Sequence, residues 1–360
     1  MKHQDLARLR YLSLVKESQR YAWWMSSKSS PISKLINLSG WRISRAIFKS
    51  LNKPSGAMAW PLGLSLLFIN SKTVSDINEF RWVSDILSDI LFDLKNHEHI
   101  HIDRAGICYA ALGLAQPKNN YIEISEMIGE KYASMPGAED GLIAYTIGKD
   151  DILVDTLGML CPFMARLGRL TGNAKFTNIA KSHLQSFNEF GMDSKSGWIS
   201  HAFKRSSKIH SGMVGWGRGV GWMLLGLTDT LLELDDTYDR DALIFNVRSL
   251  LEKLSATQRH DGHWPWCLTQ SNSTKDSSVT TLVAYSLSRL ISTMPLQFGQ
   301  YSGILNKCYI AIDEVTSKTG FVTQASGEAG GIGKYSDNFG PQLWALGPAV
   351  AMDKIVANHH

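Results

Sequence analysis

Cysteine is scarce in this sequence, and the four residues of this type stand far apart. Cys108, Cys161, Cys267 and Cys308 lack the CxxC or Cys/His spacing that a zinc site needs, so we expect reduced thiols in a core. Charge of one sign is also lacking, because 37 basic side chains face 33 acidic ones. The balance implies no strong field for nucleic acid, and we expect no nucleic-acid partner.

Long apolar runs are missing as well. The longest, residues 57–69, contains Pro61 and is too short to cross a bilayer. Residues 1–20 mix charged side chains with Leu and Tyr, and therefore lack the uninterrupted apolar region of a secretory signal. We expect a cytoplasmic protein without a membrane-spanning segment.

Motifs for common cofactors do not occur. The sequence has no phosphate-binding loop, dinucleotide fingerprint or serine nucleophile elbow. His97, His99 and His101 alternate as metal ligands on a strand can, but their surroundings are typical of a helix start. We therefore expect neither a metal nor a cofactor. The oligomeric state is not readable from these features.

Helical periodicity dominates what is present. Apolar residues recur at spacings of three and four in most long segments, for example Leu157, Leu160, Met164, Leu167 and Leu170. Alternating strand patterns are scarce, and no Ser/Gly-rich linker divides the chain. The sequence predicts an all-α protein.

A weak repeat appears where glycine precedes bulky residues. Gly141, Gly197, Gly262 and Gly320 are separated by 56, 65 and 58 residues. Each is followed by a polar loop and then by an apolar helix, which we expect to begin near Asp151, Trp216, Asp276 and Asp337 respectively. A hairpin of two helices with loops uses roughly 60 residues, so six hairpins fill the chain. A closed ring, the (α/α)6 barrel, buries an inner helix layer without needing polar capping repeats.

Such a ring brings the loops that enter successive inner helices to one end. Helix N-termini carry partial positive charge and free N–H groups, which suit a carboxylate-bearing sugar. Seven tryptophans near these loops are candidates for stacking on sugar rings, although each is equally compatible with a core position. They are Trp60, Trp198, Trp216, Trp222, Trp264, Trp266 and Trp344.

Three segments resemble the unsaturated rhamnogalacturonyl hydrolases of glycoside hydrolase family 105 and the related unsaturated glucuronyl hydrolases of family 88. Residues 154–168 are similar to the stretch around the family's catalytic aspartate. Residues 216–222, WGRGVGW, match a family signature whose Trp and Arg residues contact the unsaturated sugar. Residues 197–201, GWISH, resemble a loop whose His lines the same pocket. The likeness covers residues 55 to 350. It implies a barrel over residues 55–360, with residues 1–54 as a helical segment packed on it within a single domain.

The resemblance implies a set of site residues. Asp155 matches the catalytic aspartate and Asp103 a second site carboxylate. The substrate-binding residues would be Trp60, Tyr145, His201, Trp216, Arg218 and Trp222. Two of these depart from the family pattern. Trp60 stands where a Tyr is usual, and Tyr145 replaces a His, which puts the fine substrate preference in doubt.

The implied reaction needs one carboxyl group that gives and then takes a proton. A 4,5-unsaturated uronide carries a vinyl ether, which is protonated at carbon 4 and attacked by water at carbon 5. The resulting hemiketal opens and releases the next sugar. Such a carboxyl must start protonated, which calls for partial burial or another carboxylate nearby. No cofactor is needed.

Each candidate has a plain alternative. Asp155 and Asp103 are also suited to capping helices. Arg218, whose planar fork fits a uronate carboxylate, could instead bind a core Asp. His201 could be structural, and Trp216 and Trp222 reach one pocket only if the glycine-rich start is not helical.

Two other functions compete with the hydration of an unsaturated oligosaccharide. An inverting glycosidase of the same fold would pair Asp155 with Asp103 or Asp276, at roughly 6.5–9.5 Å. A non-catalytic sugar-binding protein would keep the pocket and lack the reaction.

Overall fold

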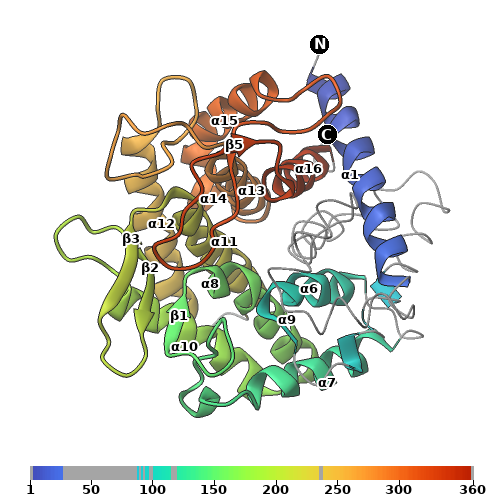
Figure 1. Cartoon of the computed structure of the whole chain (residues 1–360), viewed down its shortest axis with the longest axis vertical. Helices are drawn as coiled ribbons and strands as arrows, with labels where there is room; N and C mark the ends of the chain where they lie inside the picture. Colours follow the sequence, from blue (N-terminus) through green and yellow to red (C-terminus); the bar gives the residue numbers. More distant parts are fainter. Residues whose placement is uncertain are drawn as a thin grey trace.

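The helices of the computed structural model pack in two layers around an axis close to the line of view in Figure 1. The structure describes residues 3–26, 87–88, 91, 94–96, 100–114, 120–234 and 238–357. The inner layer consists of α6 (Ala105–Gly113), α8 (Asp155–Met159) with α9 (Cys161–Thr171), α11 (Gly217–Glu233), α13 (Ser277–Thr293) and α16 (Leu343–Ala357). In sequence order, neighbouring inner helices contact one another from α6 and α9 through α11 and α13 to α16.

Outer helices cover this layer. They are α7 (Tyr121–Ala133) and α10 (Ala174–Phe190), which pack on α9, α12 (Tyr238–Thr257) on α11, and α15 (Ser302–Glu314) on α13. Helix α11 is buried around its whole circumference, whereas α10 buries one face. An apolar helix without a polar stripe has to be enclosed on all sides, so this contrast follows from the sequence of each helix.

Within the described residues, a glycine turn introduces four connections from an outer to an inner helix. Gly141, Gly197, Gly262 and Gly320 all have positive φ, from 67° to 85°. At Gly197, Gly262 and Gly320 the same backbone hydrogen bond closes the turn around the glycine. The N–H groups that donate precede the glycine and the carbonyls that accept follow it, in the pairs Asp193–Trp198, Arg259–His263 and Ser317–Phe321. Positive φ suits glycine because it lacks Cβ. The predicted repeat is therefore a repeated turn, and it brings the N-termini of the inner helices to one end.

The predicted helix starts match at two of the four positions. Helix α11 begins at Gly217 and α13 at Ser277, with Asp276 as its N-cap. After Gly141 the chain first forms strand β1 (Asp151–Leu153) and reaches α8 at Asp155. After Gly320 a hairpin of β4 (Ala325–Ser326) and β5 (Phe339–Gly340) comes before α16 begins at Leu343. The expectation of a helix near Asp337 is wrong because this hairpin occupies that stretch.

A small antiparallel sheet lies at the same end as the glycine turns. Its order is β1, β2 (Ser200–Lys204) and β3 (His210–Val214). Strand β1 pairs with β2 in regular register, whereas the β2–β3 register shifts between Ser200 and Ala202. The shift places a bulge at His201, and bulges of this kind re-aim a side chain.

Helix α1 (His3–Ser26) lies against α16, as Figure 1 shows. The side chain of Arg10 is fully buried and forms two hydrogen bonds of 2.8 Å with the carboxylate of Asp353. It also donates to Asp313 and Thr316 at the end of α15.

The predicted boundary at residue 54 lies outside the described residues, and so does Trp60. None of the described helices combines the length and apolar character needed to span a bilayer.

All four cysteines are buried and free, as the sequence predicted. Burial raises the pKa of the Cys108 thiol to about 12. The Cys108 thiol is therefore protonated at neutral pH.

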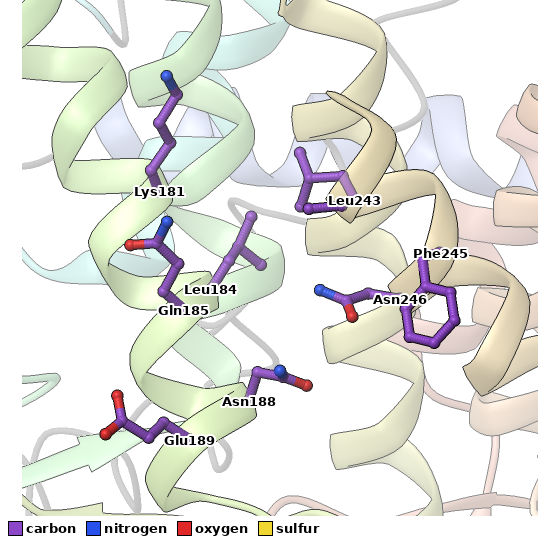
Figure 2. Close-up of a pocket in the computed structure, with 9 residues that line it drawn as sticks. Lys181, Leu184, Gln185, Asn188, Glu189, Leu243, Phe245 and Asn246 are labelled. Carbon is purple, nitrogen blue, oxygen red and sulfur yellow. The ribbon is translucent and has the colours of Figure 1, made fainter. Parts of the chain in front are cut away.

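A groove of about 410 Å³ runs between the outer helices α10 and α12. Figure 2 shows Leu184 and Leu243 toward its middle, with Lys181 and Glu189 along α10 and Phe245 on α12. It shares no residue with the candidate site described next.

Candidate active site

Asp155 is the first residue of α8 and directly follows the small sheet. The preceding residue, Val154, donates its N–H to the carbonyl of His201 at 2.9 Å, which joins the start of α8 to strand β2. The N-cap of α8 is Val154, and no side chain caps this helix. The alternative of Asp155 as an N-cap is therefore wrong. Its Oδ2 atom instead lies 3.2 Å from Nε2 of His201, and its side chain keeps 15% exposure.

His201 is buried in the bulge of β2 between Asp155 and two aromatic rings. Its ring centroid lies 4.6 Å from that of Trp216 and 5.4 Å from that of Tyr335. Nδ1 lies 2.8 Å from the Tyr335 hydroxyl. The hydrogen bond at Nδ1 and the two aromatic rings orient the imidazole, whereas Nε2 lies near Asp155 without forming a hydrogen bond to Oδ2.

The glycine-rich run begins α11 and is helical, so Trp216 and Trp222 point to different places. Trp216 is the N-cap residue and folds back over Gly219, where a Cβ atom would lie 2.9 Å from the indole and 3.0 Å from Val154. Glycine at position 219 therefore lets α11 approach the residue that precedes Asp155. Trp222 is buried against Gly158 in the interface between α8 and α11. Its role as a substrate contact stays a prediction.

Arg218 is buried between two indoles and bonded to the β4 segment. Its Nη1 donates to the carbonyl and hydroxyl of Ser326 at 2.8 and 2.9 Å, and Nη2 donates to the carbonyl of Gly327 at 3.0 Å. Its guanidinium carbon lies 4.9 Å from the Trp216 ring centroid and 5.0 Å from that of Trp344. Burial lowers the pKa of Arg218, opposed by the charges of Asp276 and Asp155. These hydrogen bonds go to neutral groups, so they leave the positive charge in place.

Asp276 is fully engaged as a cap. Oδ1 accepts from the N–H and hydroxyl of Ser278 and from the N–H of Ser326, and Oδ2 accepts from the Ser326 hydroxyl at 2.7 Å. A carboxylate with four donors on it is poorly suited to activating water. Asp276 joins α13 to the segment that Arg218 also binds.

Asp103 lies on the short 3-10 helix Ile102–Arg104, which contacts α8. It does not cap α6, whose N-cap is Arg104 without a side-chain bond. Burial acts to raise the pKa of Asp103, but Arg104 and His101 outweigh it, and the pKa is lowered. The ring of Tyr145 meets that of His101 edge-on, with centroids 4.8 Å apart. Asp103 and its neighbour His101 thus lie at the 3-10 helix that contacts α8, and Tyr145 packs on His101 from the loop before β1.

Some of the predicted tryptophans lie at the candidate site, and others are part of the core. Trp216 and Trp344 flank Arg218, and Trp266 lies edge-on to Tyr335 with centroids 6.1 Å apart. Trp264 is buried, and its Nε1 donates to the Leu254 carbonyl. Among the described residues, no group of three His, Cys, Asp or Glu side chains is placed to hold a metal ion.

Tyr335 is the site residue that sequence reasoning missed. It comes from the loop between β4 and β5, and its hydroxyl accepts the Met213 N–H at 2.8 Å. Burial raises its pKa, opposed by backbone hydrogen bonds from Met213 and Gly333. The one signal in the sequence is that Tyr335 is the only aromatic residue within the glycine-rich stretch 327–338.

Comparisons with known proteins agree on one family and one fold. The sequence model of Glycosyl Hydrolase Family 88 matches residues 77–350. No curated protein matches the chain by sequence. Solved structures do resemble it. A possible member of glycoside hydrolase family 105 from Klebsiella pneumoniae subsp. pneumoniae is 19% identical, with a TM-score of 0.72 over 84% of this chain and 82% of that one.

Two further solved structures extend the likeness. An unsaturated glucuronyl hydrolase from Bacillus sp. GL1 is 17% identical, with a TM-score of 0.67 over 84% of this chain and 86% of the other. A family 88 glycosyl hydrolase from Bacteroides vulgatus is 15% identical, with a TM-score of 0.65 over 97% and 99% of the two chains. The predicted all-α (α/α)6-barrel fold is thereby confirmed.

Proposed function

Since the chain belongs to Glycosyl Hydrolase Family 88, and is thus a glycoside hydrolase, we propose that it removes a terminal 4,5-unsaturated uronic acid from an oligosaccharide. Structural neighbours support this substrate class. One is an unsaturated glucuronyl hydrolase responsible for the degradation of glycosaminoglycan, and another is an unsaturated glucuronyl hydrolase specific for heparin. The observation that carries the proposal is the contact of Asp155 with His201. The ring of His201 packs on Trp216, and the buried charge of Arg218 interacts with Asp155.

In the proposed reaction Asp155 acts first as an acid and then as a base. Its carboxyl group protonates carbon 4 of the vinyl ether, and positive charge develops at carbon 5 and the ring oxygen. The carboxylate then takes a proton from the water that attacks carbon 5. The hemiketal opens and releases the next sugar. The 15% exposure of Asp155 supports this role, because the group has to reach both substrate and water.

The surrounding charges suit a uronate. Arg218 brings a desolvated positive charge to the site, and attraction to a substrate carboxylate is strong where water is excluded. Asp103 is ionised at neutral pH and lies on the element that packs against α8. The buried Trp216 ring packs on both His201 and Arg218, and so joins the imidazole to the charged group.

The competing glycosidase mechanism has weaker support. It needs a second carboxylate free to activate water, and Asp276 is saturated by four hydrogen bonds. Asp103 is held by His101 and Arg104.

A panel of lyase-generated unsaturated disaccharides tests the proposal. Absorbance of the conjugated double bond should fall with turnover on at least one member. Asp155→Asn should lower kcat by about 10²- to 10⁴-fold while the substrate still binds. Asp241→Asn, at an exposed position on outer helix α12, is the matched control and should react as the wild type does.

Three outcomes would contradict the proposal. No panel member reacts, or a sugar is released at constant absorbance, as an ordinary glycosidase would do. The third is that Asp155→Asn retains wild-type turnover, which would remove the proton donor from the scheme.

A further inference from the structure

The opposite charges of Arg218 and Asp276 are connected through a serine hydroxyl. Nη1 of Arg218 donates to the hydroxyl oxygen of Ser326 at 2.9 Å, and this hydroxyl lies 2.7 Å from Oδ2 of Asp276. A guanidinium has donors only, so the serine oxygen accepts from Arg218 and its own proton is directed to Asp276. The order along this chain is therefore guanidinium, hydroxyl and carboxylate. All three side chains are buried.

The carboxylate of Asp276 has its donors without any contribution from the guanidinium. Its Oδ1 atom accepts from the N–H and the hydroxyl of Ser278 and from the N–H of Ser326. Within the described residues, Oδ2 accepts one hydrogen bond, from the Ser326 hydroxyl. This hydroxyl therefore satisfies Oδ2, and it also accepts the hydrogen bond of Arg218.

Backbone contacts hold the β4 segment independently of the Ser326 hydroxyl. On one side, the Ser277 N–H at the start of α13 donates to the Gln324 carbonyl at 3.1 Å. On the other side, the Gly327 N–H donates to the Asn338 carbonyl at 2.8 Å. Loss of the hydroxyl alone should therefore leave the segment in position.

The remaining contacts of Arg218 keep its guanidinium in one plane. The carbonyls of Ser326 and Gly327 accept from Nη1 and Nη2 at 2.8 and 3.0 Å. The rings of Trp216 and Trp344 lie 4.9 and 5.0 Å from the guanidinium carbon. In the part of the chain that the structure describes, all acceptors of Arg218 are thus neutral. A carboxylate that binds the guanidinium would gain a stronger, charge-assisted hydrogen bond.

We propose that Ser326 is a positioning residue that separates Arg218 from Asp276 and so keeps the guanidinium charge for the carboxylate of a substrate. That this substrate is a uronate rests on the proposed function. Without the hydroxyl, Oδ2 of Asp276 would be a buried acceptor without a donor. Arg218 would then pair with Asp276 directly, because a bond to a carboxylate is stronger than a bond to a neutral carbonyl. A substrate would have to break that pair in order to bind.

The crystal structure of Ser326→Ala tests the separation without any substrate. An Nη atom of Arg218 should lie about 3 Å from Oδ2 of Asp276, with the β4 segment in its original place. Ser278→Ala is the matched control, because its hydroxyl donates to Oδ1 of the same carboxylate. In the control, Arg218 should stay on Ser326. If Arg218 forms no bond to Asp276 in Ser326→Ala, the proposal is overturned.

Ligand affinity tests the consequence for binding. In an Asp155→Asn background, which slows turnover, calorimetry measures Kd for the unsaturated disaccharide that the wild type hydrates and for its uncharged methyl ester. Ser326→Ala should raise Kd for the acid about 10- to 100-fold, the effect of losing a hydrogen bond to a charged group. Kd for the ester should change less than about threefold. Equal weakening of acid and ester would indicate a general loss of structure and contradict the proposal.

A double variant distinguishes the capture of Arg218 from the simple loss of a hydrogen bond. In Ser326→Ala combined with Asp276→Asn, no carboxylate remains at position 276 to pair with Arg218. Affinity for the acid should therefore return to within about threefold of the Asp276→Asn single variant. If Ser326→Ala weakens acid binding equally with Asp or Asn at position 276, the proposal is wrong. If the double variant does not fold, the crystal structure of Ser326→Ala decides the question.

The two proposals fail in distinguishable ways. If no disaccharide is hydrated but Arg218 pairs with Asp276 in Ser326→Ala, the proposed function is wrong and the separation by Ser326 stands. If a disaccharide is hydrated while Ser326→Ala leaves both Arg218 and the affinity for the acid unchanged, the function stands and the positioning role is wrong.

Discussion

Two buried histidines that are not part of the candidate site have their protonation set by burial. Nε2 of His183 accepts the Ile143 N–H at 2.9 Å, and desolvation lowers the pKa of His183 to about 3. Desolvation likewise lowers the pKa of His263 to about 4, with the nearby charge of Lys275 acting in the same direction. Both rings are neutral in the folded protein. An unfolded histidine has its pKa near 6.5, so the unfolded state binds more protons at mildly acidic pH.

The His183 shift predicts a loss of stability in acid. Because the folded-state pKa is depressed, the contribution of His183 is full above pH 6.5 and is lost as pH falls from there toward 3. His183→Gln keeps an acceptor for the Ile143 N–H but cannot be protonated. From pH 7 to pH 5 the wild type should therefore lose about 2 kcal/mol more unfolding free energy than the variant.

Urea unfolding at the two pH values measures this difference. His210→Gln, a more accessible position on β3, is the matched control and should keep the wild-type dependence on pH. An equal loss in His183→Gln and wild type would show that His183 is not the group that takes up the proton.

At the scale of single elements, two helices carry similar caps in different surroundings. Asp276 caps α13 and Asn173 caps α10, each by accepting from the N–H two residues onward. Asp276 is fully buried and also holds Ser326, whereas the Asn173 cap bond is exposed. The capping residue therefore both caps α13 and binds the β4 segment, whereas in α10 it only caps the helix.

Removing the two caps should have unequal effects. Asn173→Ala should cost about 1 kcal/mol of unfolding free energy, which is the usual effect of losing a cap. Asp276→Ala also leaves buried Ser278 and Ser326 donors without an acceptor, and should cost about 3 kcal/mol. Chemical denaturation of both variants measures the difference. Similar costs would mean that the bonds to Ser326 contribute nothing to stability.

Some of these elements could be predicted from the sequence and others could not. The turn at each repeat glycine was predictable, because positive φ and the bulky residues that follow are local properties. The hairpin of β4 and β5 was not, because its strands are two residues each and show no alternation. Tyr335 lies in that hairpin, outside every motif, whereas Asp155 and Arg218 lie in motifs that single them out.

Across the whole molecule, the buried charge of Arg10 is one of the groups that join α1 to the barrel. Arg10 bonds to Asp353, 343 residues away in sequence, and to Asp313. Burial raises the pKa of Asp353, opposed by Arg10, which lies directly against it. Residues at the two ends of the described chain are thus held together by an ion pair that excludes water.

Loss of this charge should loosen α1. Arg10→Met leaves the buried Asp353 carboxylate with only the 3.8 Å contact to Nε2 of His3, which is expected to cost about 3 kcal/mol. Arg8→Met, at an exposed position on the same helix, is the control and should cost less than about 0.5 kcal/mol. Thermal unfolding and protease cleavage within α1 measure the effect. Unfolding that matches the Arg8 variant would contradict the structural role of the pair.

The sequence by itself determined the helical class, the turn at each repeat glycine, the helix start near Asp276 and the family motifs, because these depend on residues close in the chain. Only the tertiary structure decided that Asp155 meets His201 instead of capping α8, and that Trp222 packs in the core. It also decided that Tyr335 reaches His201 across 134 residues. Such contacts depend on how two layers of helices pack, and packing is a property of the assembled chain.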